Sequence, residues 1–331
     1  MNIFRSLNEI PPDFGPAVVS IGNFDGVHCG HQWLLAEIQR SACELNVKSV
    51  AVTFDPHPSR VLRPDDAPKL ITPLPERLAL LDASGIDAVL ILPFTRELSR
   101  MSGPEFVTAV LCDALHAAEV HEGDNFRFGH RAQWHPQDLI AIGHDLGFRV
   151  RIFPPRYIRG VAVSSSKVRE SIEGGDMATA RALLGRQFSI CSSPAVGRGI
   201  GSRLTVPTIN LAPYDELIPA NGVYVTRMRV GERTFEAVTN VGNRPTFGKD
   251  SFAVESYLLN YMPDQDPLDL TGETPIELSF VHRLREERRF PSPAALKAQI
   301  LLDVARAERY FHLADLFQNE TQPAQSGNRF S

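Results

Sequence analysis

Residues 18–32 read VVSIGNFDGVHCGHQ, and this stretch decides the fold of the first part of the chain. The apolar run at 18–21 predicts a buried strand, and the glycines that follow allow tight turns and a close approach of the backbone to a ligand. A helix is expected to begin near His31. The unpaired N–H groups and the positive dipole end of that helix predict an anion site directly after the strand.

Two histidines lie where this helix begins. His28 and His31 are three residues apart, so both side chains can face one phosphate group. Transfer of a nucleotidyl group depends mainly on stabilising negative charge at the α-phosphate, which two imidazoles beside a helix N-terminus can do. A histidine here can also serve only as a cap or as a buried hydrogen-bonded ring. A zinc site is disfavoured, because no third His or Cys lies at suitable spacing.

Outward from this stretch, from Ala17 to about Ile152, short apolar runs alternate with amphipathic segments. We expect strands at 18–21, 50–54, 88–92 and 147–153, and helices at 33–45, 75–84, 106–115 and 166–184. Strand alternating with helix predicts a Rossmann-like parallel sheet with helices on both faces. The first domain is expected to span residues 1–185, with Gly185 just past the end of its last helix.

The pattern changes after Gly185. Short β-rich segments at 222–230, 234–241, 252–261 and 276–284 are separated by turn residues and predict an antiparallel barrel or sandwich. A helix is expected at about 292–311. The second domain then spans residues 186–314, and the polar segment 315–331 is expected to be a disordered tail.

Composition excludes several classes of protein. A chain of 331 residues exceeds one usual hydrophobic core, which agrees with two domains. The net charge of -5 argues against a nucleic-acid partner, so anionic ligands must be held by local groups. The start of the chain lacks an apolar leader, and no apolar run reaches bilayer length. The four cysteines are scattered without a C-x-x-C pair, as in a reducing compartment. We expect a cytoplasmic protein with no membrane partner.

A second chemical motif lies in the β-rich part of the chain. Thr208 and Asn210 are two residues apart, so their oxygens project to the same side of an extended chain. Such hard oxygen ligands suit a Mg²⁺ ion that also binds phosphates. Glu255 lies in a strand-like run and could accept the proton of an alcohol during phosphoryl transfer. The alternative is an ordinary solvent-facing glutamate on a strand.

Several strings occur together in one order along the chain. They are NFDGVHCGH at 23–31, TFDPHP at 53–58, EGDNFRFG at 122–129, VSSSKVR at 163–169, PTIN at 207–210, NVGNRPT at 240–246 and VE at 254–255. In this order and spacing, over roughly residues 15–311, the chain resembles the prokaryotic bifunctional riboflavin kinase/FAD synthetases. Two places depart from the family. HRAQW at 130–134 replaces a glycine-rich turn that contains arginine, and GS and TVPT around 201–208 replace GR and GFPT.

The resemblance implies an N-terminal nucleotidyltransferase of α/β/α architecture, followed by a six-stranded antiparallel β-barrel of the riboflavin kinase type with a terminal helix. It implies that ATP phosphorylates riboflavin to FMN and that a second ATP adenylylates FMN to FAD, with release of pyrophosphate. Mg²⁺ is the implied cofactor, and the partners are the small-molecule substrates riboflavin, FMN and ATP. Two alternatives remain, namely an FMN adenylyltransferase whose barrel only binds flavin, and a flavin sensor without turnover.

The resemblance also implies roles for individual residues. The ATP site of the adenylyltransferase comprises Gly22, Asn23, Phe24, Asp25, Gly26, His28, His31, Ser164, Ser165 and Arg169, and Asn125 contacts the FMN substrate. The phosphate site of the kinase comprises Gly197, Gly201, Pro207, Thr208 and Asn210, of which Thr208 and Asn210 bind Mg²⁺. The catalytic residues are His28, His31 and Glu255, the last as base toward the riboflavin 5′-hydroxyl. Helix capping is the alternative for the serines, and Arg285 or Glu286 could support the flavin.

Overall fold

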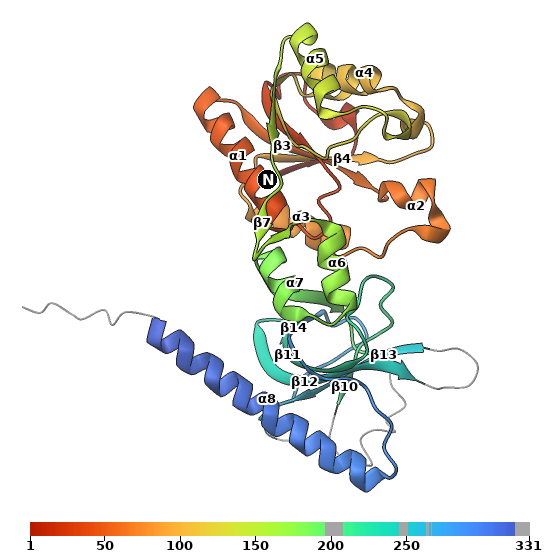
Figure 1. The fold of residues 1–331 in the computed structure, drawn as a ribbon, viewed down its shortest axis with the longest axis vertical. Helices are drawn as coiled ribbons and strands as arrows, with labels where there is room; N and C mark the ends of the chain where they lie inside the picture. The colour runs from red at the N-terminus through yellow and green to blue at the C-terminus, as the bar shows by residue number, and fades with distance from the viewer. Residues whose placement is uncertain (196–207, 245–250, 263–264, 266, 322–331) are drawn as a thin grey trace, which may run out of the picture. The chain divides into compact units, whose positions relative to one another are not determined.

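The computed structural model describes residues 1–195, 208–244, 251–262, 265 and 267–321 (Figure 1). The chain forms two compact units, the first made of Met1–Arg169 and Ala182–Gly185, the second of Glu170–Arg181 and the described residues from Arg186 onward. This differs from the single boundary expected after Gly185, because residues 170–181 group with the second unit. The grouping has local causes: Ala220 N donates to Ile172 O at 3.3 Å, and a Cβ on Gly175 would lie 2.7 Å from Arg283 Cδ.

The first unit contains a six-stranded sheet in the order β1-β4-β3-β2-β5-β6, and every adjacent pair is parallel. Its strands are β1 (Asn2–Phe4), β2 (Ala17–Ile21), β3 (Lys48–Asp55), β4 (Ala88–Pro93), β5 (Ala117–Gly123) and β6 (Arg149–Phe153). The predicted parallel sheet is therefore confirmed. Sequence reasoning missed β1 and β5; in β5, polar residues stand among the apolar ones, so the run does not resemble a buried strand.

Helices cover both faces of this sheet. The helices α1 (Cys29–Leu45) and α3 (Leu74–Ala83) pack on one face, and α4 (Gly103–Phe106), the π-helix η4 (Val107–Ala114) and α5 (Pro136–Leu146) pack on the other. The chain also forms α2 (Pro58–Leu62), α6 (Ser165–Glu173) and α7 (Met177–Leu184). Successive residues of β2 enter different cores. Val18 packs with Ile38 of α1, whereas Val19 packs with Val107 of η4 and Leu139 of α5. The unit therefore has three layers, as the sequence predicted.

Shorter elements complete the first unit. They are the 3₁₀ turns η1 (Leu7–Glu9), η2 (Pro64–Asp66), η3 (Leu98–Arg100) and η5 (His130–Ala132) and the hairpin strands β7 (Tyr157–Ile158) and β8 (Val161–Ala162). The single helix expected at 166–184 is two helices. Gly174 and Gly175 separate α6 from α7, and Gly175 has a φ of +76°, which ends a right-handed helix at little cost only with glycine.

The second unit is an antiparallel six-stranded sheet in the order β10-β13-β12-β11-β14-β9. Its elements are β9 (Phe188–Ser192), β10 (Ile209–Asn210), β11 (Gly222–Val230), β12 (Arg233–Arg244), β13 (Ser251–Leu258), β14 (Ile276–Arg285) and helix α8 (Pro293–Thr321). The two edges meet beyond β9 and β10. Ala195 N donates to Asn210 O and Ala212 N to Ser193 O, both at 2.8 Å. The sheet thus closes into the predicted barrel, which removes its exposed edges.

Helix α8 packs on the outside of the barrel through Ala307 and Phe311, against Val223 and Val225 of β11. It continues to Thr321, past the end expected near residue 311 and into the segment from 315 that was expected to be a disordered tail. The reason lies in the sequence, because residues 312–321 include leucine and alanine and contain neither glycine nor proline. Residues 322–331 lie outside the described part of the chain.

Candidate functional site

The candidate nucleotide site of the first unit lies at the carboxyl end of β2, where the direction of strand addition reverses. From β2 the chain adds β3 and β4 on one side, whereas β5 and β6 lie on the other side of β2. Open parallel sheets bind ligands in the crevice at this position. The loop that follows β2, residues 22–28, is called the phosphate loop below. It shares this position with the EGDNFRFG segment that begins in β5, about 100 residues further along the chain.

His28 and His31 lie together at the start of α1. His28 is the N-cap residue, and its Nδ1 accepts a hydrogen bond from His31 N at 3.3 Å. The two rings are stacked, with centroids 3.7 Å apart and planes 11° apart. Because Nδ1 of His28 is an acceptor, the neutral ring carries its proton on Nε2. His28 therefore does act as a cap, and this role leaves its other nitrogen chemically able to donate.

Gly30 is required beside the two rings. A Cβ at this position would lie 3.2 Å from the His28 ring, which is closer than most side-chain contacts. The spacing His-x-Gly-His thus has a steric cause: the glycine leaves room for the first imidazole over the first turn of α1.

The His31 side chain is half-buried, and its Nδ1 is fully enclosed. Burial lowers the pKa of His31 well below its ordinary value, and the neighbouring His28 lowers it further. His31 Nδ1 is buried and has no hydrogen-bond partner among the described residues. A buried polar atom without a partner is uncommon in folded proteins and is expected at a ligand contact. The arrangement therefore fits an imidazole that bonds to a phosphate oxygen only when nucleotide is bound.

Asp25 holds the phosphate loop to distant segments. Its buried carboxylate accepts hydrogen bonds from Ile71 N and Thr72 N, each at 3.0 Å, and forms an ion pair with Arg169. In the sequence, Asp25 is far from Arg169 and from the segment around Ile71. The carboxylate oxygens thus bond to groups of the protein itself, and this network fixes the position of the loop.

The predicted pyrophosphate residues meet the same loop. Ser165 Oγ donates to Asp25 O at 2.8 Å, and Arg169 Nε donates to Lys69 O at 2.8 Å. Ser164 Oγ accepts from Lys167 N at 3.3 Å, which is a helix cap at the start of α6. The structure therefore brings Ser165 and Arg169 against the phosphate loop, while Ser164 shows the capping contact that was the alternative for it.

Arg77 of α3 also belongs to this site, and sequence reasoning missed it. Its side chain is buried, and NH1 donates to Asn23 O at 2.7 Å while NH2 donates to Phe54 O at 3.3 Å. Burial lowers the pKa of Arg77, and the carboxylates of Asp25 and Asp55 oppose this effect. A signal was present in the sequence, because the arginine lies three residues from Leu74 and four from Leu81, on the apolar face of the helix.

Asn125 lies just after β5. It is exposed, and its Oδ1 is 3.1 Å from the position that a Cβ on Gly123 would take. The absence of a side chain at Gly123 therefore lets the amide turn back toward the end of the strand. The same turn follows Glu122, whose carboxyl group bonds to the main chain of β2.

The candidate kinase site lies on one row of the barrel. Asn210 of β10 is directly opposite Glu255 of β13, and Glu255 is directly opposite Asn240 of β12. Side chains directly opposite on one face have Cβ atoms about 5 Å apart. Thr208, which is exposed, precedes Asn210 by two residues. Gly197, Gly201 and Pro207 lie outside the described residues.

This row offers oxygen ligands for a hard cation. Within the described residues, no group of three or more His, Cys, Asp or Glu side chains could hold a metal ion. A hydroxyl, an amide oxygen and one nearby carboxylate suit Mg²⁺, which keeps several waters and is shared with substrate phosphates. The donor set therefore fits Mg²⁺ and does not fit a zinc site.

Arg285 connects the barrel to α8. Its guanidinium donates to Asp303 Oδ2 through Nε at 2.9 Å, and Gln299 Nε2 donates to Asp303 Oδ1 at 2.8 Å. Asp303 and Gln299 are buried, whereas Glu286 is exposed. The first observed role of Arg285 is thus to fix the helix on the barrel.

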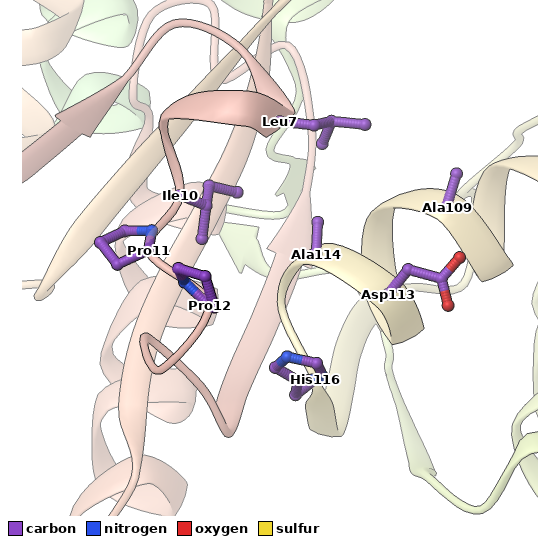
Figure 2. A pocket seen from close by; sticks show the side chains of 8 residues that line it. All are labelled: Leu7, Ile10, Pro11, Pro12, Ala109, Asp113, Ala114 and His116. Carbon is purple, nitrogen blue, oxygen red and sulfur yellow. The ribbon is translucent and has the colours of Figure 1, made fainter.

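A surface hollow of about 500 Å³ lies at the other end of the strands of the parallel sheet (Figure 2). Pro11 and Pro12, which line it, precede β2, and His116 precedes β5. Asp113 is the only carboxylate among the lining residues. The hollow is therefore at the amino ends of the strands and is separate from the phosphate loop.

Comparisons with known proteins agree with the division of the chain into two parts. The family profile of FAD synthetase matches residues 10–167, and the profile of riboflavin kinase matches residues 184–311. The chain is similar to the bifunctional riboflavin kinase/FMN adenylyltransferase of Pseudomonas fluorescens, with 35% identity over 93% of this chain and 97% of the relative. The enzyme of the same name from Escherichia coli K12 is 32% identical over 95% of this chain and 99% of its own length.

A solved structure shares the fold. It is titled as a macrolide-efflux protein from Streptococcus pneumoniae, and it superposes with a TM-score of 0.82 at 25% identity, over 92% of this chain and 98% of its own. In the part of our chain that the structure describes, no helix is both long and apolar enough to cross a bilayer.

Two family profiles in tandem, relatives above 30% identity over nearly the full length, and the expected side chains at two separate sites lead to one conclusion. The chain belongs to the family of bifunctional riboflavin kinase/FMN adenylyltransferases.

Proposed function

We propose that this chain phosphorylates riboflavin to FMN in its second unit and adenylylates FMN to FAD in its first. One observation supports this most strongly: a single chain holds a paired-histidine phosphate loop at the switch point of a parallel sheet and an Asn210–Glu255 row on a closed barrel. We assign the adenylyltransferase domain to residues 1–185 and the kinase domain to residues 186–314. Helices α6 and α7 each belong in part to both compact units.

In the adenylyltransferase reaction, a phosphate oxygen of FMN attacks the α-phosphorus of ATP, and the bond from that phosphorus to the bridging oxygen of pyrophosphate breaks. Negative charge grows on the oxygens of the α-phosphate and of the leaving group. His28 and His31 donate hydrogen bonds to these oxygens, and the N-terminus of α1 adds a positive potential. Ser165 and Arg169 are placed beside the same loop to hold the pyrophosphate. Asn125 contacts the FMN.

In the kinase reaction, the riboflavin 5′-oxygen attacks the γ-phosphorus of ATP, and the bond to the β-phosphate oxygen breaks. Glu255 accepts the proton of the 5′-hydroxyl, so that the attacking oxygen does not become positively charged. Thr208 and Asn210 would hold Mg²⁺ together with the ATP phosphates. When bound, the ion neutralises phosphate charge. The three residues share one side of the barrel because β10 pairs with β13.

The cysteines and the net charge support the proposal of an enzyme that binds small molecules in a reducing compartment. All four cysteines lie within the described residues and form no disulfide there. The net charge of -5 offers no basic surface for nucleic acid. We therefore propose the cytoplasm as the place of work, with riboflavin, FMN and ATP as the partners.

The test separates the two sites by mutation. Purified protein is incubated with riboflavin, ATP and Mg²⁺, and FMN and FAD are measured over time by chromatography. His28→Ala is expected to abolish FAD formation and to leave FMN formation within about twofold, because removal of groups that act in the transition state lowers only that step. Glu255→Ala is expected to abolish FMN formation while FAD still forms from added FMN.

The outcomes distinguish the proposed function from its two alternatives. Wild-type protein that makes FAD from FMN but no FMN from riboflavin would favour the adenylyltransferase whose barrel only binds flavin. Flavin binding with no consumption of ATP would favour the sensor. Loss of both activities in a folded single variant would contradict the proposal of two independent sites.

A further inference from the structure

We infer that Glu122 is a positioning residue of the adenylyltransferase site: its carboxyl group replaces a main-chain acceptor between β2 and β5 and holds the last peptide of β2, directly before the phosphate loop. The inference rests on the proposed function of the first unit. It concerns a residue of β5 that stands before the Gly123 turn and contacts neither histidine in the structure. Three observations carry it.

The first observation is the end of the ladder between β2 and β5. The two strands pair in parallel at Val18 with Glu119 and at Val19 with Val120, and the pairing goes no further. Ile21 N, the next amide of β2 that points to β5, donates to Glu122 Oε1 at 2.6 Å. A side-chain oxygen thus takes the place of a carbonyl oxygen of the neighbouring strand. Because a side chain is inserted, the two strands can separate where the phosphate loop leaves the sheet.

The second observation is the burial of this carboxyl group. Glu122 is 2% exposed, and burial raises its pKa well above the ordinary value, while the hydrogen bond from Ile21 opposes this effect more weakly. An isolated charged carboxylate in such a place would be costly, whereas a neutral carboxyl group with a hydrogen bond is not. Burial therefore favours the protonated, uncharged form of Glu122, in which its carbonyl oxygen accepts the hydrogen bond from Ile21 N.

Other ionisable groups near the strand do not neutralise it. On β5 and β6, Glu119, His121 and Arg149 interact with one another. By strand alternation they lie on the opposite face from Glu122, and β2 contains no ionisable side chain. The helices on the face of Glu122 carry the ionisable residues Glu105, Cys112, Asp113, Asp138, His144 and Asp145. Of these, Glu105, Asp113, His144 and Asp145 are exposed, and Asp138 accepts a hydrogen bond from His135 N. Burial raises the pKa of the Cys112 thiol.

The third observation is position. Ile21 is the last residue of β2, so the amide that Glu122 holds is adjacent to Gly22, the first residue of the phosphate loop. Further along the same loop, Arg77 holds the carbonyl of Asn23. The chain is therefore held from β5 at Ile21, just before the loop begins, and from α3 at Asn23, within the loop. Glu122 fixes the end of β2 on the side of the crevice, next to the segment that carries Asn125.

The test compares Glu122→Gln, which keeps a neutral acceptor of nearly the same shape, with Glu122→Leu, which removes the acceptor. Glu119→Gln, on the same strand but the opposite face, is the control. We expect Glu122→Leu to raise the KM for ATP in FAD formation by about tenfold, the usual effect of losing a buried hydrogen bond. We expect Glu122→Gln and Glu119→Gln to stay within about threefold of wild type at pH 7. FMN formation, measured in the same samples, should be unchanged.

The pH profile gives a readout that a purely structural role would not change. In wild type, ionisation of Glu122 as the pH rises should raise the KM for ATP, and Glu122→Gln should remove this rise. Trp33 and Trp134 both lie in the first unit, so tryptophan fluorescence reports whether that unit is folded in each variant. If Glu122→Leu fails to fold, the pH profile of Glu122→Gln still tests whether Glu122 positions the phosphate loop.

The inference is overturned if folded Glu122→Leu binds ATP as wild type does, or if Glu122→Gln loses as much as Glu122→Leu. An alkaline rise in KM that persists in Glu122→Gln also overturns it. Failure of the proposed function is a different result, since wild-type protein would then make no FAD from FMN and ATP at any pH.

Discussion

At the scale of single residues, the first site depends on a few side chains whose surroundings change their chemistry. The two stacked imidazoles share one turn of helix, and the inner ring is held neutral by burial. Asp25 is an aspartate, a residue type that often binds metal ions. Here its carboxylate bonds instead to Arg169 and to two main-chain amides. A residue's type therefore limits its possible roles, and its neighbours select among them.

Gly30 gives a prediction about the position of the His28 ring. A methyl group there would lie 3.2 Å from the His28 ring, so the imidazole must shift by a few tenths of an ångström. Since a small misplacement at a reacting centre can cost two orders of magnitude in rate, Gly30→Ala is expected to slow FAD formation by about tenfold or more. FMN formation measured in the same protein should not change. An unaltered rate of FAD formation would show that the ring position has no tight requirement.

At the scale of elements, helices and strands place these residues by the periods of their apolar faces. Helix α1 begins at the cap residue His28, and its buried residues Leu35, Ile38 and Ala42 lie on the side toward the sheet. Helix α3 buries Leu81 and, on the same side, Arg77. The helix thus packs against the sheet and at the same time presents a cation to the phosphate loop.

Arg77 gives a prediction about this element. Arg77→Met keeps much of the side-chain volume but removes the donors to Asn23 O and Phe54 O. Two part-buried carbonyl groups then lose a donor, although Asn23 O keeps the hydrogen bond from Thr53 Oγ1. We therefore expect the free energy of unfolding of the first unit to fall by about 1–2 kcal/mol and the KM for ATP to rise. Denaturant titration and steady-state kinetics measure the two effects. Arg40→Met, at an exposed position of α1, should change stability by less than about 0.5 kcal/mol.

At the scale of the whole molecule, ionisable groups are distributed unequally between the two units. Burial lowers the pKa of His31, His57 and His121, and all three lie in the first unit. Burial raises the pKa of Glu122 in the first unit and of Glu236 in the second. The pH dependence of stability should therefore differ between the units.

The sign follows from proton binding in the folded and unfolded states. A histidine that is neutral when folded takes up a proton only on unfolding once the pH falls below about 6.5, so its effect is to lower stability on the acid side. Glu122, protonated when folded, has the opposite effect, and stability falls as the pH rises above about 4.3. Three histidines outnumber one glutamate between pH 5 and 6.5. The first unit should lose stability as the pH falls through this range.

Scanning calorimetry at pH 5 to 8 measures this. We expect the transition assigned to the first unit by its shift in Arg77→Met to move to lower temperature at acid pH, and the transition of the second unit to move less. Glu122→Gln should steepen the change, because it removes the opposing group. A first-unit transition that stays constant from pH 7 to pH 5 would contradict the neutral state of the buried histidines.

Sequence alone determined the features that depend on local periodicity and local chemistry. The strand, glycine-rich loop and helix around His28 and His31, the alternation of strand and helix, the β-rich second part and the pair Thr208 and Asn210 could all be predicted, because side-chain period and turn chemistry act over a few residues. Strand β5 could not, because its buried polar residues Glu119, His121 and Glu122 interrupt the apolar pattern.

Only the tertiary structure decided which distant groups meet. The hydrogen bond from Ile21 to Glu122 spans 101 residues and the contact of Arg169 with Asp25 spans 144, and the alignment of Asn210 with Glu255 depends on strand register. Register and burial are set by the packing of whole elements, in which a shift of one residue turns every side chain to the other face. The motifs therefore belong to the sequence, whereas the hold on the phosphate loop from β5, α3 and α6 belongs to the fold.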